Sequence, residues 1–169
     1  MIETFHLKSG VTLRCFRDDR FKQGRLSVQF VCPLRSETAA LNALLPSVLI
    51  RGCKSAPDLR AITLRLDDLY GASVGELVRK VGDYQTTGLT CGFIQDRYAL
   101  EPEGILGPMI AFVTELLTDP LVEKGVFVEE FVESEKKNLI AAIEAKRNNK
   151  RSYASARMLE HMCREDSLG

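Results

Sequence analysis

The residues with the most evident chemical potential are Glu160 and His161, which lie in the stretch ARMLEHMC near the end of the sequence. In the zinc-peptidase motif H-x-x-E-H, two histidines bind the metal and the glutamate handles the proton of the attacking water. Here Arg157 occupies the first histidine position. An arginine repels a cation, and the motif needs two histidines one turn apart on one helical face. We therefore interpret Glu160 and His161 as part of an ordinary helix without a metal role.

The remaining histidine and the cysteines add no recognisable site. His6 is the other histidine of the chain and lies far from His161 in the sequence. No two of the five cysteines form a C-x-x-C pair, which argues against a zinc ribbon, a redox motif or a disulfide framework. We expect reduced, mostly buried thiols, and no thiol nucleophile, because no histidine stands beside one in a protease pattern. The cysteines are Cys15, Cys32, Cys53, Cys91 and Cys163.

Other charged and glycine-rich stretches have structural explanations. Asp67 and Asp68 are adjacent, and neighbouring helical residues point about 100° apart, so a solvated face is favoured over a catalytic acid pair. Residues 128–137 place acids before lysines, which suits the dipole of a helix. The basic patch 146–151 fits either a helix C-terminus or contact with an acidic partner. No glycine pattern matches a dinucleotide fingerprint or a phosphate-binding loop.

Composition indicates one water-exposed domain. The chain has 169 residues, with 23 acidic and 23 basic side chains that cancel. This balance gives no general attraction to nucleic acid or to an anionic membrane. No apolar run reaches the roughly 18–20 residues of a membrane span, and the first residues lack the apolar region of a signal peptide. We expect a cytoplasmic protein that forms one domain over residues 1–169, without nucleic-acid or membrane partners.

Periodicity predicts strands first and then helices. Residues 2–9 and 11–16 read as two strands around a Ser-Gly turn, and 24–32 as a third that Pro33 stops. A helix is predicted from Ser36, which can cap it, to Gly52, which can end it. Pro46 inside this helix should remove one backbone hydrogen bond and kink the helix.

Further along, helices and strands alternate in groups. Pro57 and Asp58 begin a second helix, and Gly71 supplies the turn that ends it. Two strands follow, joined by a Gly82-Asp83 turn, with a bulge expected near Gly75. Helices are predicted over 104–118, 126–147 and 152–163. The long helix should turn inward Phe127, Phe131, Leu139, Ile140 and Ile143. This order predicts an α+β fold, with a mainly antiparallel sheet packed on one face by helices.

Four stretches occur in an order that resembles a known family. They read NALLPSVLIRG, LRLDDLYGASV, ELLTDP and NNKRSYASARMLEHMC. Together they resemble the insulinase/pitrilysin family of inverted-zincin peptidases, and more closely its bacterial non-peptidase branch, the elongation factor P aminopentanol-modification-associated proteins. The resemblance implies the half-domain fold of mitochondrial processing peptidase and LuxS-like proteins. It also implies that residues 1–169 are the N-terminal half-domain of a longer chain, which closes with a second half over a peptide.

The resemblance also places the zinc ligands of active relatives on this sequence. Aligning their glycine with Gly52 puts the first histidine at Ala43, the glutamate at Pro46 and the second histidine at Ser47. Neither alanine nor proline offers a group that binds metal or accepts a proton. Ser47 alone cannot hold zinc, because catalytic sites use three protein ligands.

The third zinc ligand of active relatives is a glutamate two helical turns after another acid. If Glu135 is that first acid, the ligand position is Ala142, with Glu144 as a nearby alternative on another side of the helix. We therefore expect no catalytic residue, no metal site and no cofactor in this chain.

The resemblance implies a non-catalytic subunit. It would enclose a peptide or protein ligand and pair, for example as a heterodimer, with a homologous half-domain or a zinc-bearing peptidase-like subunit. Strand addition at the sheet edge is a physically reasonable way for it to bind. Lysine modification of elongation factor P is the pathway that the family suggests. Two alternatives stay open: an active zinc metallopeptidase with unorthodox or externally supplied ligands, and a structural half-domain that binds no peptide.

Overall fold

The computed structural model describes residues 2–100 and 104–163, and its centre is a three-stranded antiparallel sheet. The strands are β3 (Gln23–Pro33), β4 (Ser73–Val81) and β5 (Tyr84–Ile94), in the order β3-β5-β4. The predicted turn joins β4 to β5, and Gly82 adopts a positive φ of 56° there. Glycine at the first central position is what a two-residue hairpin of type II′ requires.

The glycine that the sheet requires is Gly88 in β5, and not Gly75 in β4, where a bulge was predicted. The pairing of β4 with β5 runs without a register shift from Ser73 to Val81, so the bulge expected near Gly75 is absent there. The residue that must be glycine is Gly88, in the middle of β5. It has a φ of 155°, and a Cβ atom there would lie 2.0 Å from the carbonyl oxygen of Val28. The close approach of β3 to β5 therefore depends on Gly88.

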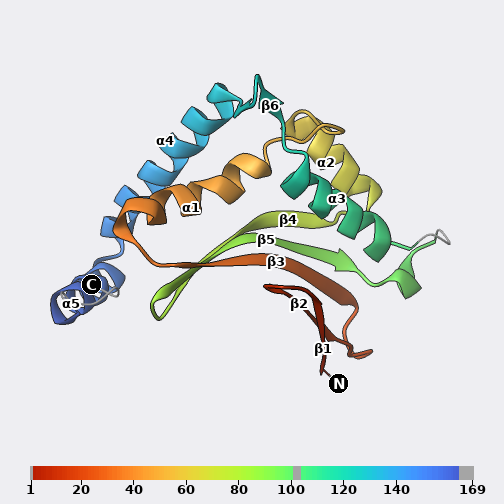
Figure 1. Ribbon diagram of the computed structural model, residues 1–169, viewed down its shortest axis with the longest axis horizontal. Helices are drawn as coiled ribbons and strands as arrows, with labels where there is room; N and C mark the ends of the chain where they lie inside the picture. Colours follow the sequence, from red (N-terminus) through yellow and green to blue (C-terminus); the bar gives the residue numbers. More distant parts are fainter. Residues whose placement is uncertain (1, 101–103, 164–169) are drawn as a thin grey trace.

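The first two strands form a separate hairpin. β1 (Ile2–Lys8) pairs with β2 (Val11–Phe16) around Gly10, as predicted, and the register shifts between His6 and Lys8. Every residue of both strands is exposed. The hairpin lies on the side of the large sheet that faces away from the helices (Figure 1).

Four helices lie on the opposite side of the sheet, which confirms the predicted α+β class (Figure 1). They are α1 (Ser36–Leu49), α2 (Leu59–Asp68), α3 (Leu106–Thr118) and α4 (Glu129–Ala145). The core forms where α3 meets the inner side of β5. Its largest fully buried members, each less than 2% exposed, are Leu89 and Cys91 of β5, Met109, Phe112, Val113 and Leu116 of α3, and Pro46, Cys53 and Ile105 outside these two elements.

Two predicted ends of α1 are wrong. The residue that caps the helix is Arg35, without a side-chain hydrogen bond, rather than Ser36. At the other end, α1 stops at Leu49, before Gly52. A Cβ atom on Gly52 would lie 2.8 Å from the carbonyl oxygen of Pro57, so this glycine permits a close backbone approach instead of capping the helix.

The second half departs from the predicted helix near residue 126. A small hairpin of β6 (Val122–Glu123) and β7 (Val126–Phe127) precedes α4, so Phe127 lies in a strand. Within α4, Phe131 and Leu139 are half-buried as predicted. Ile140 and Ile143 are 48% and 53% exposed, so their predicted inward orientation is wrong.

The last helix stands apart from the helices that cover the sheet (Figure 1). After the short 3-10 turns η1 (Asp96–Tyr98) and, at the predicted break, η2 (Lys146–Asn148), α5 runs over Lys150–Met162. The side chain of Asn149 caps α5 by accepting a hydrogen bond from the backbone N–H of Ser152 at 3.1 Å. All residues of α5 are exposed.

The cysteines and the helices bear on two further predictions. All five cysteines are free thiols, as expected, but only Cys53 and Cys91 are buried. Cys15 is exposed and the other two are intermediate, so the expectation of mostly buried thiols is wrong.

In the described parts of the chain, none of the helices has the length and apolar character that crossing a membrane demands.

Candidate functional site

The three positions that the sequence resemblance assigns to H-x-x-E-H, namely Ala43, Pro46 and Ser47, lie on α1, where the helix packs between the sheet and α4. Ala43 and Ser47 are half-buried, and Pro46 is buried. The helix continues through Pro46, as α1 extends to Leu49. This segment of α1 is therefore packed against its neighbours, and the polar groups around it determine which interactions it can make.

Pro46 leaves one carbonyl of α1 without its helical donor, and the sheet supplies a replacement. Proline has no N–H, so the carbonyl oxygen of Asn42, four residues earlier, loses its intrahelical hydrogen bond. The hydroxyl of Thr87 on β5 donates to this oxygen at 2.7 Å. Thr87 is only 5% exposed. A buried carbonyl without a partner is costly, so this contact stabilises the helix at the position of the proline.

A glutamine extends the same polar contact between α1 and β5. The side chain of Gln85 donates to the carbonyl oxygen of Ala39 at 3.0 Å and accepts from the side chain of Asn42 at 3.1 Å. Gln85 is 5% exposed. Thr87 and Gln85 point to the same face of β5 because they are two residues apart. Together they fix α1 on the sheet by hydrogen bonds as well as apolar packing.

Ser47, the only one of the three α1 positions with an oxygen, is engaged with the edge strand. Its hydroxyl donates to the carboxylate of Glu76 on β4 at 2.5 Å. This bond joins α1 to the free edge of the sheet. The Ser47 hydroxyl is also the only side-chain oxygen among Ala43, Pro46 and Ser47, and this hydrogen bond already occupies it.

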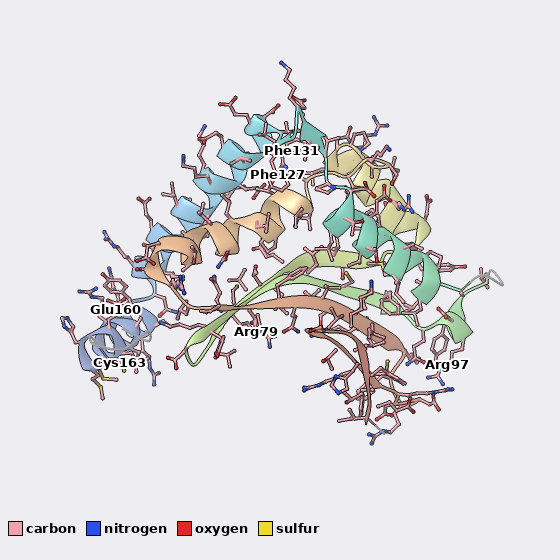
Figure 2. The ribbon with its side chains drawn as sticks, viewed as in Figure 1. Arg79, Arg97, Phe127, Phe131, Glu160 and Cys163 are labelled. Atoms are coloured by element: carbon pink, nitrogen blue, oxygen red, sulfur yellow. The ribbon has the colours of Figure 1, made fainter. Side chains whose placement is uncertain are left out.

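Glu135 on α4 likewise binds a protein group. Its carboxylate lies 3.3 Å from the guanidinium of Arg51, and the two side chains are 14% and 23% exposed. The same guanidinium lies 5.3 Å from the centre of the Phe131 ring, and Figure 2 shows Phe131 at the start of α4. Ala142 and Glu144, the possible third-ligand positions, are both exposed.

The donor set around α1 does not fit zinc. Ala43 and Pro46 have no ligand atoms, Ser47 is bound to Glu76, and Glu135 is bound to Arg51. Within residues 2–100 and 104–163, no group of three histidine, cysteine or acidic side chains lies close enough together to hold a metal ion. The arrangement holds α1, α4 and β4 together.

The pair that resembles the motif in sequence lies elsewhere. Glu160 forms an ion pair with Arg157 on the exposed helix α5, and Figure 2 shows Glu160 at the end of the molecule opposite Arg97. His161 is exposed on the same helix, while His6 lies on β1. Asp67 and Asp68 are exposed at the end of α2, as a solvated face requires.

Sequence reasoning did not identify the residues that surround α1. The alternation of β5 contains the relevant signal, since Gln85 and Thr87 occupy positions of the same face as buried Leu89. Polar residues at core-facing positions of a strand indicate a specific partner. The identity of that partner depends on the packing of α1, which the sequence pattern does not give.

Comparison with known proteins identifies a similar bacterial protein. No protein-family model matches the chain. It is 29% identical over 157 residues to the protein named "Probable inactive metalloprotease YmfF" from Bacillus subtilis (strain 168). This match covers 93% of the chain and 37% of the relative.

A crystal structure of a conserved protein from Enterococcus faecalis V583 has the same fold. The TM-score is 0.89 with 28% identity, over 99% of this chain and 41% of that protein. The chain thus spans less than half of the length of both relatives.

Proposed function

We propose that the chain is a catalytically inactive, peptidase-like half-domain that binds an extended peptide or protein segment and pairs with a homologous partner. The observation that supports this proposal is Pro46, which stands at the position that the resemblance assigns to the general base. The hydrogen bond from Thr87 completes the helix around this proline. A site built in this way has no group to activate water. The function that we propose for this fold is therefore to bind an extended peptide segment.

The free edge of β4 is the surface that we propose for binding. In the described part of the chain, β4 pairs only with β5, so its other edge presents unpaired backbone groups. The two-residue turn after Val81 makes Val81 and Tyr84 a hydrogen-bonded pair, so the backbone groups of Glu76 and Val78 point to the open edge. An added strand would use these groups and would pass beside α1, to which Glu76 is joined through Ser47.

The partner that we propose is a homologous half-domain or a zinc-bearing, peptidase-like subunit, with residues 1–169 as the N-terminal half. The relatives are more than twice as long as the matched region, which leaves room for a second half in such proteins. The pathway that the sequence resemblance suggests is aminopentanol modification of a lysine on elongation factor P. Co-expression with an H-x-x-E-H relative from the same genome, followed by light scattering on a sizing column, tests the pairing. Separate elution of the two proteins would contradict it.

Metal analysis distinguishes this function from that of an unorthodox zinc peptidase. We expect far less than one zinc per chain after dialysis, and no hydrolysis of a quenched fluorescent peptide. Near-stoichiometric zinc that is lost together with hydrolytic activity would establish the alternative.

A proline on the edge strand tests peptide binding. The variant Val78→Pro removes the outward N–H, whereas Val78→Thr keeps it and preserves the branched shape. Binding of a fluorescein-labelled, unstructured casein peptide is measured by anisotropy, and circular dichroism checks that both variants fold. We expect binding by the parent chain and Val78→Thr and a loss in Val78→Pro. Equal binding by both folded variants would rule out strand addition at β4, and absence of binding by the parent would favour a purely structural half-domain.

A further inference from the structure

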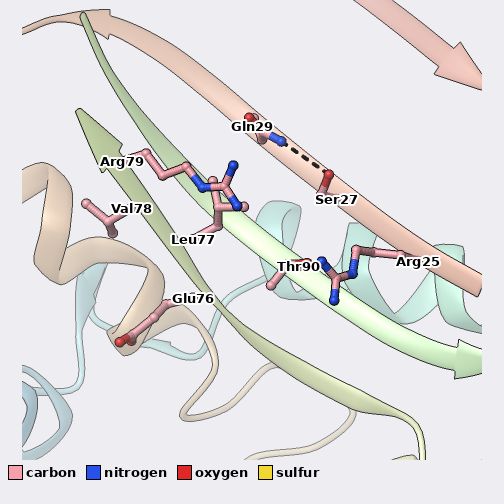
Figure 3. Close-up of a pocket in the computed structure, with 8 residues that line it drawn as sticks. All are labelled: Arg25, Ser27, Gln29, Glu76, Leu77, Val78, Arg79 and Thr90. Carbon is pink, nitrogen blue, oxygen red and sulfur yellow. Dashed lines mark hydrogen bonds between the residues drawn. The ribbon is translucent and has the colours of Figure 1, made fainter. Parts of the chain in front are cut away.

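The face of the large sheet opposite the helices contains a trough that runs along β5. Residues that pair directly across the strands share a face, and on this face the middle of β5, between Tyr84 and Ile94, presents only small side chains. They are Thr86, Gly88, Thr90 and Gly92. The flanking strands carry longer ones, notably Arg25 and Gln29 on β3 and Arg79 on β4. A hollow of about 420 Å³ results, and Figure 3 shows the side chains that line it.

Two arginines approach the trough from opposite ends. Arg25 pairs with Gly92 and Arg79 with Thr86, six positions apart on β5, or about 20 Å of extended strand. Their side chains extend toward the middle of the trough in Figure 3, and both line the same hollow as Thr90 and Leu77. In the part of the chain that the structure describes, neither guanidinium makes a hydrogen bond or an ion pair.

The lining explains which kind of ligand these charges suit. Glu76 is the one acidic residue of the lining, and its carboxylate accepts a hydrogen bond from Ser47 on the helix side of the sheet. The side-chain amide of Gln29 donates a hydrogen bond to the hydroxyl of Ser27 at 3.2 Å, and both side chains can form further hydrogen bonds. Leu77, 8% exposed, gives an apolar floor. Because the whole chain has a formal net charge of zero, the positive charge here is local.

We propose that this trough binds an acidic, extended peptide segment, with carboxylates near Arg25 and Arg79. Guanidinium groups bind carboxylates in paired hydrogen bonds, and an extended segment of about six residues spans the 20 Å between the two positions. A second hollow of about 230 Å³ shares Arg25 and Thr90 and continues the trough past Gly75. This surface lies on the other side of the sheet from α1 and differs from the β4 edge in using the side chains of Arg25 and Arg79, although Glu76 and Val78 border both.

Charge-neutralising variants of the full chain test the site. The probe is a fluorescein-labelled peptide of four Ser-Glu repeats, with the Ser-Gln peptide as its uncharged counterpart. We expect the glutamate peptide to bind more tightly, and Arg25→Gln and Arg79→Gln each to weaken it about three- to tenfold, since each removes a charge-assisted contact. Arg60→Gln is the matched control, because Arg60 is exposed on α2 among the helices.

A steric variant tests the shape of the trough without a change of charge. A Cβ atom on Gly75 would meet nothing within 4 Å, and its φ is not positive, so Gly75→Leu fills the second hollow without strain. We expect this variant to fold normally and to bind the glutamate peptide several-fold more weakly. Unchanged affinity in folded Gly75→Leu would remove the proposed path of the peptide.

Three further outcomes would overturn the proposal. Equal affinity for the glutamate and glutamine peptides would show that carboxylates are not recognised. An equal loss in Arg60→Gln would attribute the binding to general charge. Tighter binding of a 12-nucleotide single-stranded DNA through the same two arginines would identify a nucleic-acid surface instead.

Discussion

The hydroxyl of Thr87 lies 2.7 Å from the carbonyl oxygen of Asn42 and donates the hydrogen bond that Pro46 cannot. A residue of the sheet thus completes a helix at the position that the sequence resemblance assigns to a general base. The carbonyl oxygen of Asn42, which has no helical N–H partner, therefore still accepts a hydrogen bond from a buried donor. This hydrogen bond also explains how a proline persists inside α1.

The contribution of Thr87 should depend on Pro46. We predict that Thr87→Val destabilises the chain by about 1–2 kcal/mol, because the buried carbonyl of Asn42 loses its donor. In a Pro46→Ala background the helix can supply its own N–H, so the same substitution should cost about 1 kcal/mol less. Urea unfolding of the four proteins measures this coupling.

The coupling distinguishes this account from a simple packing effect. Pro46→Ala leaves a cavity, so its own effect on stability is not informative. If the cost of Thr87→Val is the same in both backgrounds, Thr87 does not compensate for the proline.

The sequence predicted the elements better than their contacts. Alternation located β3, strand-like runs on either side of the Gly82-Asp83 turn located β4 and β5, and Pro46 was expected to remove a hydrogen bond from its helix. Thr87 could not be identified as the replacement donor, because its contact with Asn42 joins residues 45 positions apart. The spacing of Ile140 and Ile143 predicted a buried face of α4, but these positions are exposed. Periodicity indicates which residues can share a face and leaves open whether a neighbour covers it.

The glycines of the sheet illustrate the same limit. A glycine in a strand indicates a bulge or a close approach of backbone, and the sequence does not say which glycine has that role. Gly75 attracted the prediction because its strand alternates poorly, whereas the contact that excludes a side chain is at Gly88. The empty donor positions of the candidate site, by contrast, came from the family resemblance together with the residue types at those positions, so they could be proposed before the structure was known.

Alanine substitution should strongly lower the stability of the chain at Gly88 and leave it almost unchanged at Gly75. Gly88→Ala places a Cβ atom 2.0 Å from the carbonyl oxygen of Val28, at a φ that alanine rarely adopts. We predict a loss of more than about 3 kcal/mol, or failure to fold, because the pairing of β3 with β5 must separate. Gly75→Ala meets open space and should change stability by less than about 0.5 kcal/mol.

Thermal unfolding followed by circular dichroism measures both glycine variants. Equal stability of the two would contradict the close approach of Val28 to Gly88.

The contact between Arg51 and Glu135 should join α1 to α4 with measurable energy. Both side chains are largely buried, so removing one partner leaves a poorly solvated charge. We predict that Glu135→Gln costs about 1–2 kcal/mol and that Arg51→Ala costs more, because it also removes the contact with Phe131. Denaturant unfolding of the single and double variants gives the coupling energy, which should exceed about 1 kcal/mol.

An exposed ion pair serves as the control for this coupling. Lys136 and Glu133 are paired on the same helix with about half of each side chain exposed. The corresponding cycle for that pair should give less than about 0.5 kcal/mol. Similar coupling for the two pairs would mean that burial does not strengthen the contact with Arg51.

The thiol of Cys91 should make stability fall at alkaline pH. Burial raises the pKa of Cys91 from an ordinary 9.0 to about 11, because the thiolate is poorly solvated in the core. Between these values the unfolded chain releases the proton while the native chain retains it. Stability from this source is therefore complete below about pH 9 and is lost as the pH rises toward 11.

The variant Cys91→Ala isolates this contribution, since it removes the titrating thiol from the same site. Urea unfolding at pH 8 and pH 10.5 should show that the parent chain loses on the order of 2 kcal/mol more than Cys91→Ala over this interval. Cys15→Ala removes an exposed thiol and should follow the parent chain. If Cys91→Ala loses as much stability as the parent between these two pH values, the buried thiol does not titrate as its surroundings require.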